Sequence, residues 1–150
     1  MHEGFFFKPT FKENAMRYPS FSAPAIGLAC LATSLLAQGQ PAIPAFQTQG
    51  AASFACGGIG EPSSKAMLAA RKEYPLSLLF ATTSGEYMAS VNVTVKDSKG
   101  ASVLAIPSTG PICLIKLPDG SYTVEAQGAG KTKSQGVTVG GGPKAIDFSF

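Results

Sequence analysis

Beyond Pro75 the sequence alternates between apolar and polar side chains, and this period of two limits the possible folds more than any other feature. The clearest run is Val91 to Val95, in which three valines alternate with Asn92 and Thr94. Successive side chains of an extended chain point to opposite faces, so such a run predicts a strand with one buried face. Similar runs recur as far as residue 150.

Turn residues divide this region into about seven short strands, expected at 76–81, 91–96, 101–106, 112–117, 122–127, 131–139 and 146–150. Short connections of the hairpin type favour mostly antiparallel pairing. We therefore predict an all-β fold, an antiparallel β-sandwich of about seven strands over residues 76–150. The predicted core consists of apolar residues that share strand faces: Leu78, Phe80, Val91, Val93, Tyr122, Val124, Ile146 and Phe148. Val103 is the expected anchor of the strand at 101–106.

The segment 46–75 is predicted to be a linker followed by one short helix. Up to Gly60 it is rich in Gln, Ala, Gly and Ser, which is typical of a flexible connection. Ser63 or Ser64 is a suitable N-cap for a helix that must end before Pro75. A helix this short is unstable alone, so we expect it to dock on the sandwich.

The first 45 residues, 1–45, are predicted to be a signal or leader segment. No charged residue occurs between Arg17 and Glu61, and an apolar stretch at 23–37 follows the cationic start. This stretch is too short for a confident membrane span, so none is expected after cleavage of the leader. Met16 is an alternative start, and an uncleaved leader is the competing interpretation. The expected location is periplasmic or secreted.

The chain has three cysteines, and one of them, Cys30, lies in the predicted leader. Cleavage leaves Cys56 and Cys113, which we expect to form a disulfide in an oxidising compartment. Closing a loop of that length stabilises the fold by roughly 4 kcal/mol in the chain-entropy model. A metal-binding or reactive thiol is the alternative, but metal sites need several ligands and the only histidine is His2.

The segment 116–126 resembles the signature hairpin of carboxypeptidase regulatory-like domains and their prealbumin-like relatives. In those families Leu-Pro-x-Gly precedes x-Tyr-x-Val, and the matching residues here are Leu117, Pro118, Gly120, Tyr122 and Val124. Pro118 and Gly120 suit a tight turn, while Tyr122 and Val124 share one face of the strand. The resemblance covers residues 76–150 and implies a prealbumin-like sandwich.

The segment 56–74 is in turn similar to the lead-in of small exported proteobacterial proteins that carry such a domain. These resemblances say little about function, because adhesin repeats and transport-related modules share the hairpin.

The sequence predicts no catalytic, cofactor-binding or metal-binding site. Without a histidine beyond His2, neither a Ser-His nor a Cys-His pair is available. Gly140 to Gly142 precedes a strand, so it is a turn and not a phosphate-binding loop. Related adhesin domains form Lys–Asn isopeptide bonds assisted by a buried acid, but Glu125 and Asp147 alternate outward. We therefore expect a protein that is not an enzyme.

Two functional hypotheses remain. From residue 46 onward nine Lys or Arg residues and seven Asp or Glu residues are dispersed, so nucleic acid is not an expected partner. The favoured hypothesis is a structural or protein-interaction module whose partner is another envelope protein. The alternative is a periplasmic accessory protein that binds a small ligand or glycan. The chain has no Trp, and Tyr87 is the only sandwich aromatic outside the core pattern, which disfavours a sugar platform.

Overall fold

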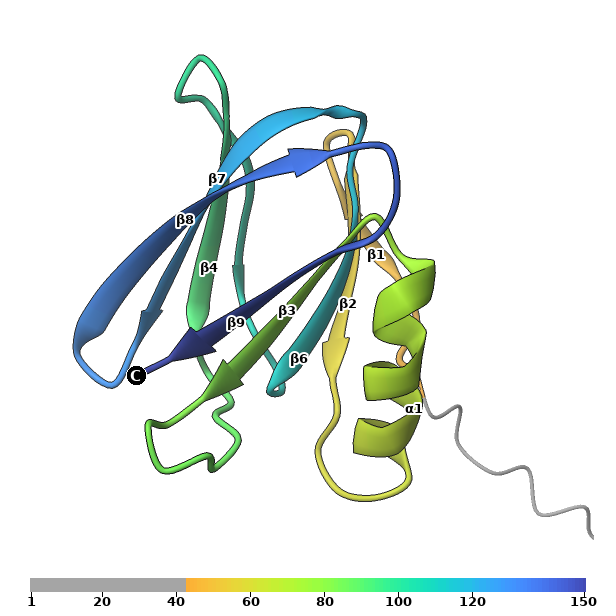
Figure 1. Ribbon diagram of the computed structural model, residues 1–150, viewed down its shortest axis with the longest axis vertical. Coiled ribbons are helices and arrows are strands. Elements are labelled where there is room, and N and C mark those ends of the chain that lie inside the picture. The colour runs from red at the N-terminus through yellow and green to blue at the C-terminus, as the bar shows by residue number, and fades with distance from the viewer. Residues whose placement is uncertain (1–42) are drawn as a thin grey trace, which may run out of the picture. The chain divides into compact units, whose positions relative to one another are not determined.

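The computed structural model describes residues 43–150, which form two β-sheets and one short helix (Figure 1). The predictions for the leader, for Cys30 and for a start at Met16 lie outside the described residues.

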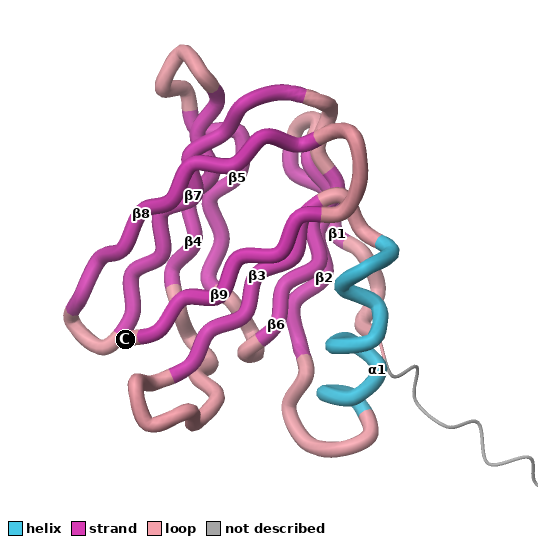
Figure 2. Tube along the Cα trace, viewed as in Figure 1, coloured by secondary structure: helices cyan, strands magenta, loops and turns pink. Residues whose placement is uncertain are grey.

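The strands form a five-stranded sheet in the order β1-β2-β6-β3-β9 and a four-stranded sheet in the order β5-β4-β7-β8. Figure 2 shows the course of the strands in the two sheets. Buried apolar side chains from both sheets form a common core. The strand bounds are β1 Gln47–Gln49, β2 Ala52–Gly57, β3 Leu76–Ala81, β4 Asn92–Asp97, β5 Ser102–Pro107, β6 Ile112–Lys116, β7 Gly120–Gly128, β8 Lys131–Val139 and β9 Lys144–Ser149.

The seven strands from β3 to β9 occupy the region in which the alternating pattern predicts seven. The pairing is mostly antiparallel, as predicted; the exception to the antiparallel sandwich is β3 and β9, which run parallel from Leu76 opposite Lys144 to Ala81 opposite Ser149. Hairpin length constrains only strands that follow one another in sequence. Between β3 and β9 the chain forms the strands β4 to β8, and so long a connection permits parallel pairing.

The core between the sheets contains most of the predicted residues, with two corrections. Tyr122 is only partly buried and packs against the core from its margin. Val103 is also partly buried, while its neighbour Leu104 is fully buried, as is most of Ile106. The pairing of β4 with β5 skips Val103 at a register shift, and this irregularity decides which side chains face inward.

The prediction of a flexible linker is wrong for residues 47–57, which form the β1-β2 hairpin. β2 pairs with β6 from Ser53 opposite Lys116 to Gly57 opposite Ile112, so the folded unit begins well before residue 76. The buried side chains of β2 are small: Ala52, Ala55 and Cys56. Such small residues can be buried in a sheet without giving the sequence a clear alternation of large apolar and polar side chains. The composition of β2 therefore resembles that of a flexible linker.

Helix α1 spans Ser63–Ala70 and continues as a 3-10 turn, η1, over Arg71–Glu73. Its N-cap residue is Pro62, so the prediction that Ser63 or Ser64 caps it is wrong; both serines lie inside the helix. The expected docking is observed. A second apolar cluster joins α1 to the outer face of the five-stranded sheet through Met67, Ala70, Ile112 and Leu114. The interior residues of β6 are therefore buried on both faces.

Within residues 43–150, no helix combines the length and the apolar character that crossing a membrane requires.

Candidate functional site

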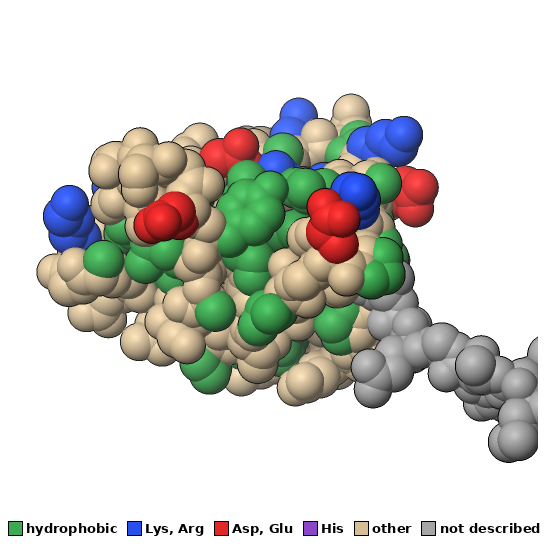
Figure 3. All heavy atoms as spheres, turned by 90° about the horizontal axis from the view of Figure 1, so that it is seen from below, with side chains coloured by type: hydrophobic (Ala, Val, Ile, Leu, Met, Phe, Trp, Pro, Cys, Tyr) green, Lys and Arg blue, Asp and Glu red, His purple; other side chains and the backbone are tan. Residues whose placement is uncertain are grey.

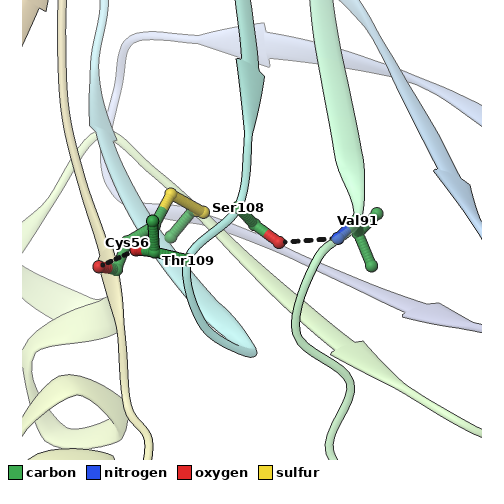
Figure 4. The surroundings of a disulfide bond; sticks show 5 residues. Cys56, Val91, Ser108 and Thr109 are labelled. Carbon is green, nitrogen blue, oxygen red and sulfur yellow. Dashed lines mark hydrogen bonds between the residues drawn. A yellow bond between two sulfur atoms is a disulfide. The ribbon is translucent and has the colours of Figure 1, made fainter.

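The predicted disulfide between Cys56 and Cys113 is present and joins adjacent strands of one sheet. Cys56 near the end of β2 lies directly opposite Cys113 near the start of β6, with their Cα atoms 4.1 Å apart. Both side chains are buried. The bond therefore cross-links the five-stranded sheet at the end where β2 leaves it, as Figure 4 shows.

Two hydroxyl groups beside this disulfide connect the sheets (Figure 4). Thr109 Oγ1 donates a hydrogen bond of 2.9 Å to the carbonyl oxygen of Cys56. The buried Ser108 accepts a hydrogen bond of 3.0 Å at Oγ from the backbone N–H of Val91. Ser108 and Thr109 are consecutive, so one short segment is bonded to β2 in one sheet and to the approach to β4 in the other.

Backbone bonds strengthen the same contact. The Ser108 N–H donates to the Val91 carbonyl at 2.8 Å, and the Ser90 N–H donates to the Ser108 carbonyl at 3.0 Å. Together with the hydroxyl contact, these bonds satisfy the polar groups of Ser108, which a buried position requires.

Two glycines let the loops approach closely here. A Cβ added at Gly110 would lie 2.3 Å from the carbonyl oxygen of Gly57, so a side chain at Gly110 does not fit without moving the backbone. Gly58 has φ +89, and a Cβ there would meet Ile112 at 2.9 Å. The loop after β2 is consequently packed against the loop before β6.

The connection between β3 and β4 is also closed by hydrogen bonds. The Thr82 N–H donates to the Glu86 carbonyl at 2.8 Å, and the Glu86 N–H donates to Thr82 Oγ1 at 3.1 Å. The Met88 N–H then donates to the Phe80 carbonyl at 3.0 Å. These bonds hold the loop in one conformation, and its last residue, Ser90, is bonded to Ser108.

We call these three connections the loop end: residues 58–62, 82–90 and 108–111. They lie at the bottom of the sandwich in Figure 1. Among the described residues, the exposed large hydrophobic side chains are Ile59 and Tyr87, which are 69% and 51% exposed. Both belong to the loop end. Figure 3, which views the molecule from below, shows hydrophobic side chains gathered there among acidic and basic ones.

The exposure of Tyr87 agrees with its place outside the core pattern. Sequence reasoning missed Ile59 because it lies in the predicted linker. Its position between Gly58 and Gly60, in a loop that immediately follows a disulfide-bonded residue, was the available signal.

The residues of the signature hairpin lie at the opposite end of the sandwich. Leu117 and Val124 are buried, and the Tyr122 hydroxyl donates to the carbonyl oxygen of Pro118 at 2.7 Å. Tyr122 therefore braces its own turn, which explains why its ring remains at the margin of the core. The structure does not bring the hairpin and the disulfide together.

The two carboxylates considered for isopeptide chemistry point outward as expected. Asp147 forms an ion pair with Arg71, and its side chain is 64% exposed. Glu125 forms an ion pair of 2.9 Å with Lys96 across the outer face of the four-stranded sheet. Within the described part of the chain, no three or more His, Cys, Asp and Glu residues are grouped so that they could hold a metal ion.

A cleft of about 480 Å³ opens where β1 and β5 form neighbouring edges of the two sheets. None of its lining residues is charged; they include Gln47, Phe54 and Thr109. The side chain of Gln49 in β1 joins the two edges. It accepts a hydrogen bond of 2.7 Å from the Ala105 N–H of β5 and donates one of 3.4 Å to the Ala105 carbonyl.

No protein-family model matches the chain, and no curated protein matches it.

Proposed function

We propose that this chain is a non-catalytic protein-interaction module of the cell envelope, which binds a partner protein through the loop end. The observation that carries the proposal is the gathering of the exposed large hydrophobic side chains, Ile59 and Tyr87, on one braced end. Interfaces between proteins centre on a few aromatic and aliphatic anchors surrounded by polar groups. Glu61, Lys65 and Glu86 supply such polar surroundings.

The bracing supports this role because binding costs less conformational entropy when the anchors are already held in place. The disulfide and the Thr109 contact hold the start of the loop that carries Ile59. The Thr82 turn holds the loop that carries Tyr87. Neither anchor therefore needs extensive ordering when the partner arrives.

The disulfide also supports the proposed location. Structural disulfides persist in oxidising compartments such as the periplasm and the extracellular space. A leader within residues 1–45 is the proposed route of export. N-terminal sequencing of the mature protein tests it, since a chain that begins at Met1 or Met16 contradicts cleavage.

We retain membership of the carboxypeptidase regulatory-like, prealbumin-like domains as part of the proposal. Its support is the hairpin from Leu117 to Val124, in which the Tyr122 hydroxyl bond to Pro118 gives the tyrosine of the pattern a structural role. That role is independent of any ligand, so the resemblance leaves the interaction surface open.

The test is partner capture from envelope extracts by the full chain, followed by comparison of single variants. Ile59→Ser and Tyr87→Ser should each reduce recovery of the same partner at least about tenfold, which is typical of the loss of an interface anchor. Ser98→Ala, an exposed change in the turn between β4 and β5, is the matched control and should leave recovery unchanged. Equal recovery with both loop-end variants would disprove the proposed surface.

The alternative is an accessory protein that binds a small uncharged ligand or a glycan, and the neutral cleft between β1 and β5 favours it. Gln47 and Thr109 offer polar groups, and Phe54 offers an apolar wall. A melting-temperature screen with neutral sugars and amino acids distinguishes the two functions, because a bound ligand stabilises the folded state. A rise that Gln47→Ala removes would favour the cleft over the loop end.

A further inference from the structure

The two sheets have four edge strands, and they differ in how well an additional strand could pair with them. β1 has only three residues. β5 contains a register shift, ends in Pro107, and has both backbone groups of Ala105 bonded to the Gln49 side chain. β9 has six residues and contacts β8. Short strands, bulges, proline, charged side chains such as Lys, and covering elements are the usual protections of an edge.

β8 also contacts β9 and carries two lysines, but it is longer than the other three edges and has no register shift. It runs from Lys131 to Val139 and pairs with β7 at all nine positions without a register shift. It contains no proline, and the residues from Lys131 to Gly136 are all exposed. In Figure 1 it forms the outer edge of its sheet. Every second residue of an edge strand directs its N–H and C=O away from the paired neighbour, so β8 offers a long regular row of such groups.

The charge of this edge is positive. Lys131 and Lys133 occupy the same face of β8 as the buried Val139, yet both are exposed. The Lys133 ammonium lies 6.0 Å from the centre of the Phe150 ring. The three ion pairs of the described residues involve Lys65, Arg71 and Lys96, so neither lysine of β8 is in one. β8 itself contains no acidic residue.

This combination selects the kind of strand that can add. Parallel pairing of β8 with β8 of a second copy would place each lysine beside its counterpart, and like charges directly opposite are destabilising. Antiparallel pairing centred on Gln135 would place Lys131 and Lys133 opposite valines, which supply no matching charge. A strand that carries carboxylates at alternate positions instead places them beside the lysines on one face. Its backbone pairs with the outward-directed N–H and C=O groups of β8, as in recognition by β-strand addition.

We infer that β8 is a docking edge for an extended acidic segment of a partner protein, which adds to the four-stranded sheet next to β8. The backbone of β8 supplies the pairing, and Lys131 and Lys133 select the charge. No residue of β8 belongs to the loop end, so this inference does not rest on the proposed function.

The probe is a synthetic peptide in which Glu alternates with Thr and Val, added to the full, oxidised chain. A matched peptide with Lys in place of Glu is the control. Amide hydrogen exchange followed by NMR should show alternate β8 amides slowed by about tenfold or more at saturating acidic peptide. The Lys-containing peptide should leave their exchange unchanged.

Charge-reversed variants make the test specific. The double variant Lys131→Glu/Lys133→Glu should lose the protection by the acidic peptide and gain protection by the Lys-containing one. Lys99→Glu, an exposed change in the turn between β4 and β5, should behave as the parent chain. Tyr87→Ser should bind the acidic peptide normally, so this inference and the proposed function can fail separately.

Two results would overturn the inference. One is chemical-shift changes limited to the lysine side chains, with no protection of β8 amides, which would indicate surface attraction without strand pairing. The other is protection that persists unchanged in the charge-reversed variant, provided that its circular dichroism spectrum and melting temperature match those of the parent chain.

Discussion

The two ends of the sandwich are stabilised in different ways. At the end with the hairpin turn, Tyr122 bonds to Pro118, four residues earlier in the chain. At the loop end, the contacts join residues far apart: Ser108 and Val91 are separated by 17 residues, Thr109 and Cys56 by 53, and the two cysteines by 57.

The difference shows which end depends on the complete fold. The hairpin turn can form whenever its own short segment is extended and turned. The loop end exists only when β2, the approach to β4 and the start of β6 have all assembled. Changes at the loop end should therefore affect the stability of the whole sandwich, while changes at the hairpin should have smaller, local effects.

Removing the disulfide should have the largest effect. The double variant Cys56→Ala/Cys113→Ala should lower the free energy of unfolding by about 2–5 kcal/mol, because the unfolded chain is no longer constrained. Denaturant unfolding monitored by circular dichroism measures it, with the reduced parent chain as the control. A free energy of unfolding equal to that of the oxidised parent would contradict a stabilising role of the disulfide at the loop end.

Ser108→Ala tests the hydroxyl contact between the segment after β5 and the approach to β4 at the loop end. It leaves the Val91 N–H without its hydroxyl partner in a buried place, which should cost about 1–3 kcal/mol of unfolding free energy. Ser134→Ala, at an exposed position on β8, is the matched control and should change the value by less than about 0.5 kcal/mol. Equal effects of the two variants would contradict the role assigned to Ser108.

Tyr122→Phe removes the hydroxyl bond of the hairpin and retains the ring. The expected loss is about 0.5–1.5 kcal/mol, near the lower limit because Pro118 is exposed and water can replace the hydroxyl. The same unfolding experiment measures it. A loss larger than that of Ser108→Ala would contradict the expectation that changes at the loop end destabilise the fold more than changes at the hairpin.

Tyr87→Ser should have the smallest effect on stability, within about 0.5 kcal/mol, because about half of the side chain is exposed. Thermal unfolding measures it directly. This result would show that any loss of partner binding by the variant arises at the surface. A substantial fall in melting temperature would instead assign Tyr87 a packing role and weaken the comparison.

The sequence predicted the strands after Pro75 better than it predicted the region before. In β4 the alternation of Val93 and Val95 with polar residues corresponds to buried and less buried positions in the structure. In β2 the small buried residues leave no comparable pattern. The face of β5 was misassigned at Val103 because a register shift depends on the neighbouring strand, whose position the local sequence does not encode.

The candidate site was predictable only in its covalent part. Two cysteines remain after the predicted leader, so their pairing was expected from their number and from the predicted oxidising compartment. The exposure of Tyr87 also followed from its place outside the alternation. The hydroxyl contacts of Ser108 and Thr109 have no signature, since both residue types are common in turns.

By itself the sequence determined where strands form after residue 75, which faces are apolar, and which cysteines pair. These properties depend on alternation between neighbouring residues and on the number of cysteines. The tertiary structure alone decided that β2 joins the sheet, that β3 and β9 run parallel, and that three distant loops form one braced end. Each of these depends on which segments meet in space, where hydrogen bonding and burial across large sequence separations outweigh local preference.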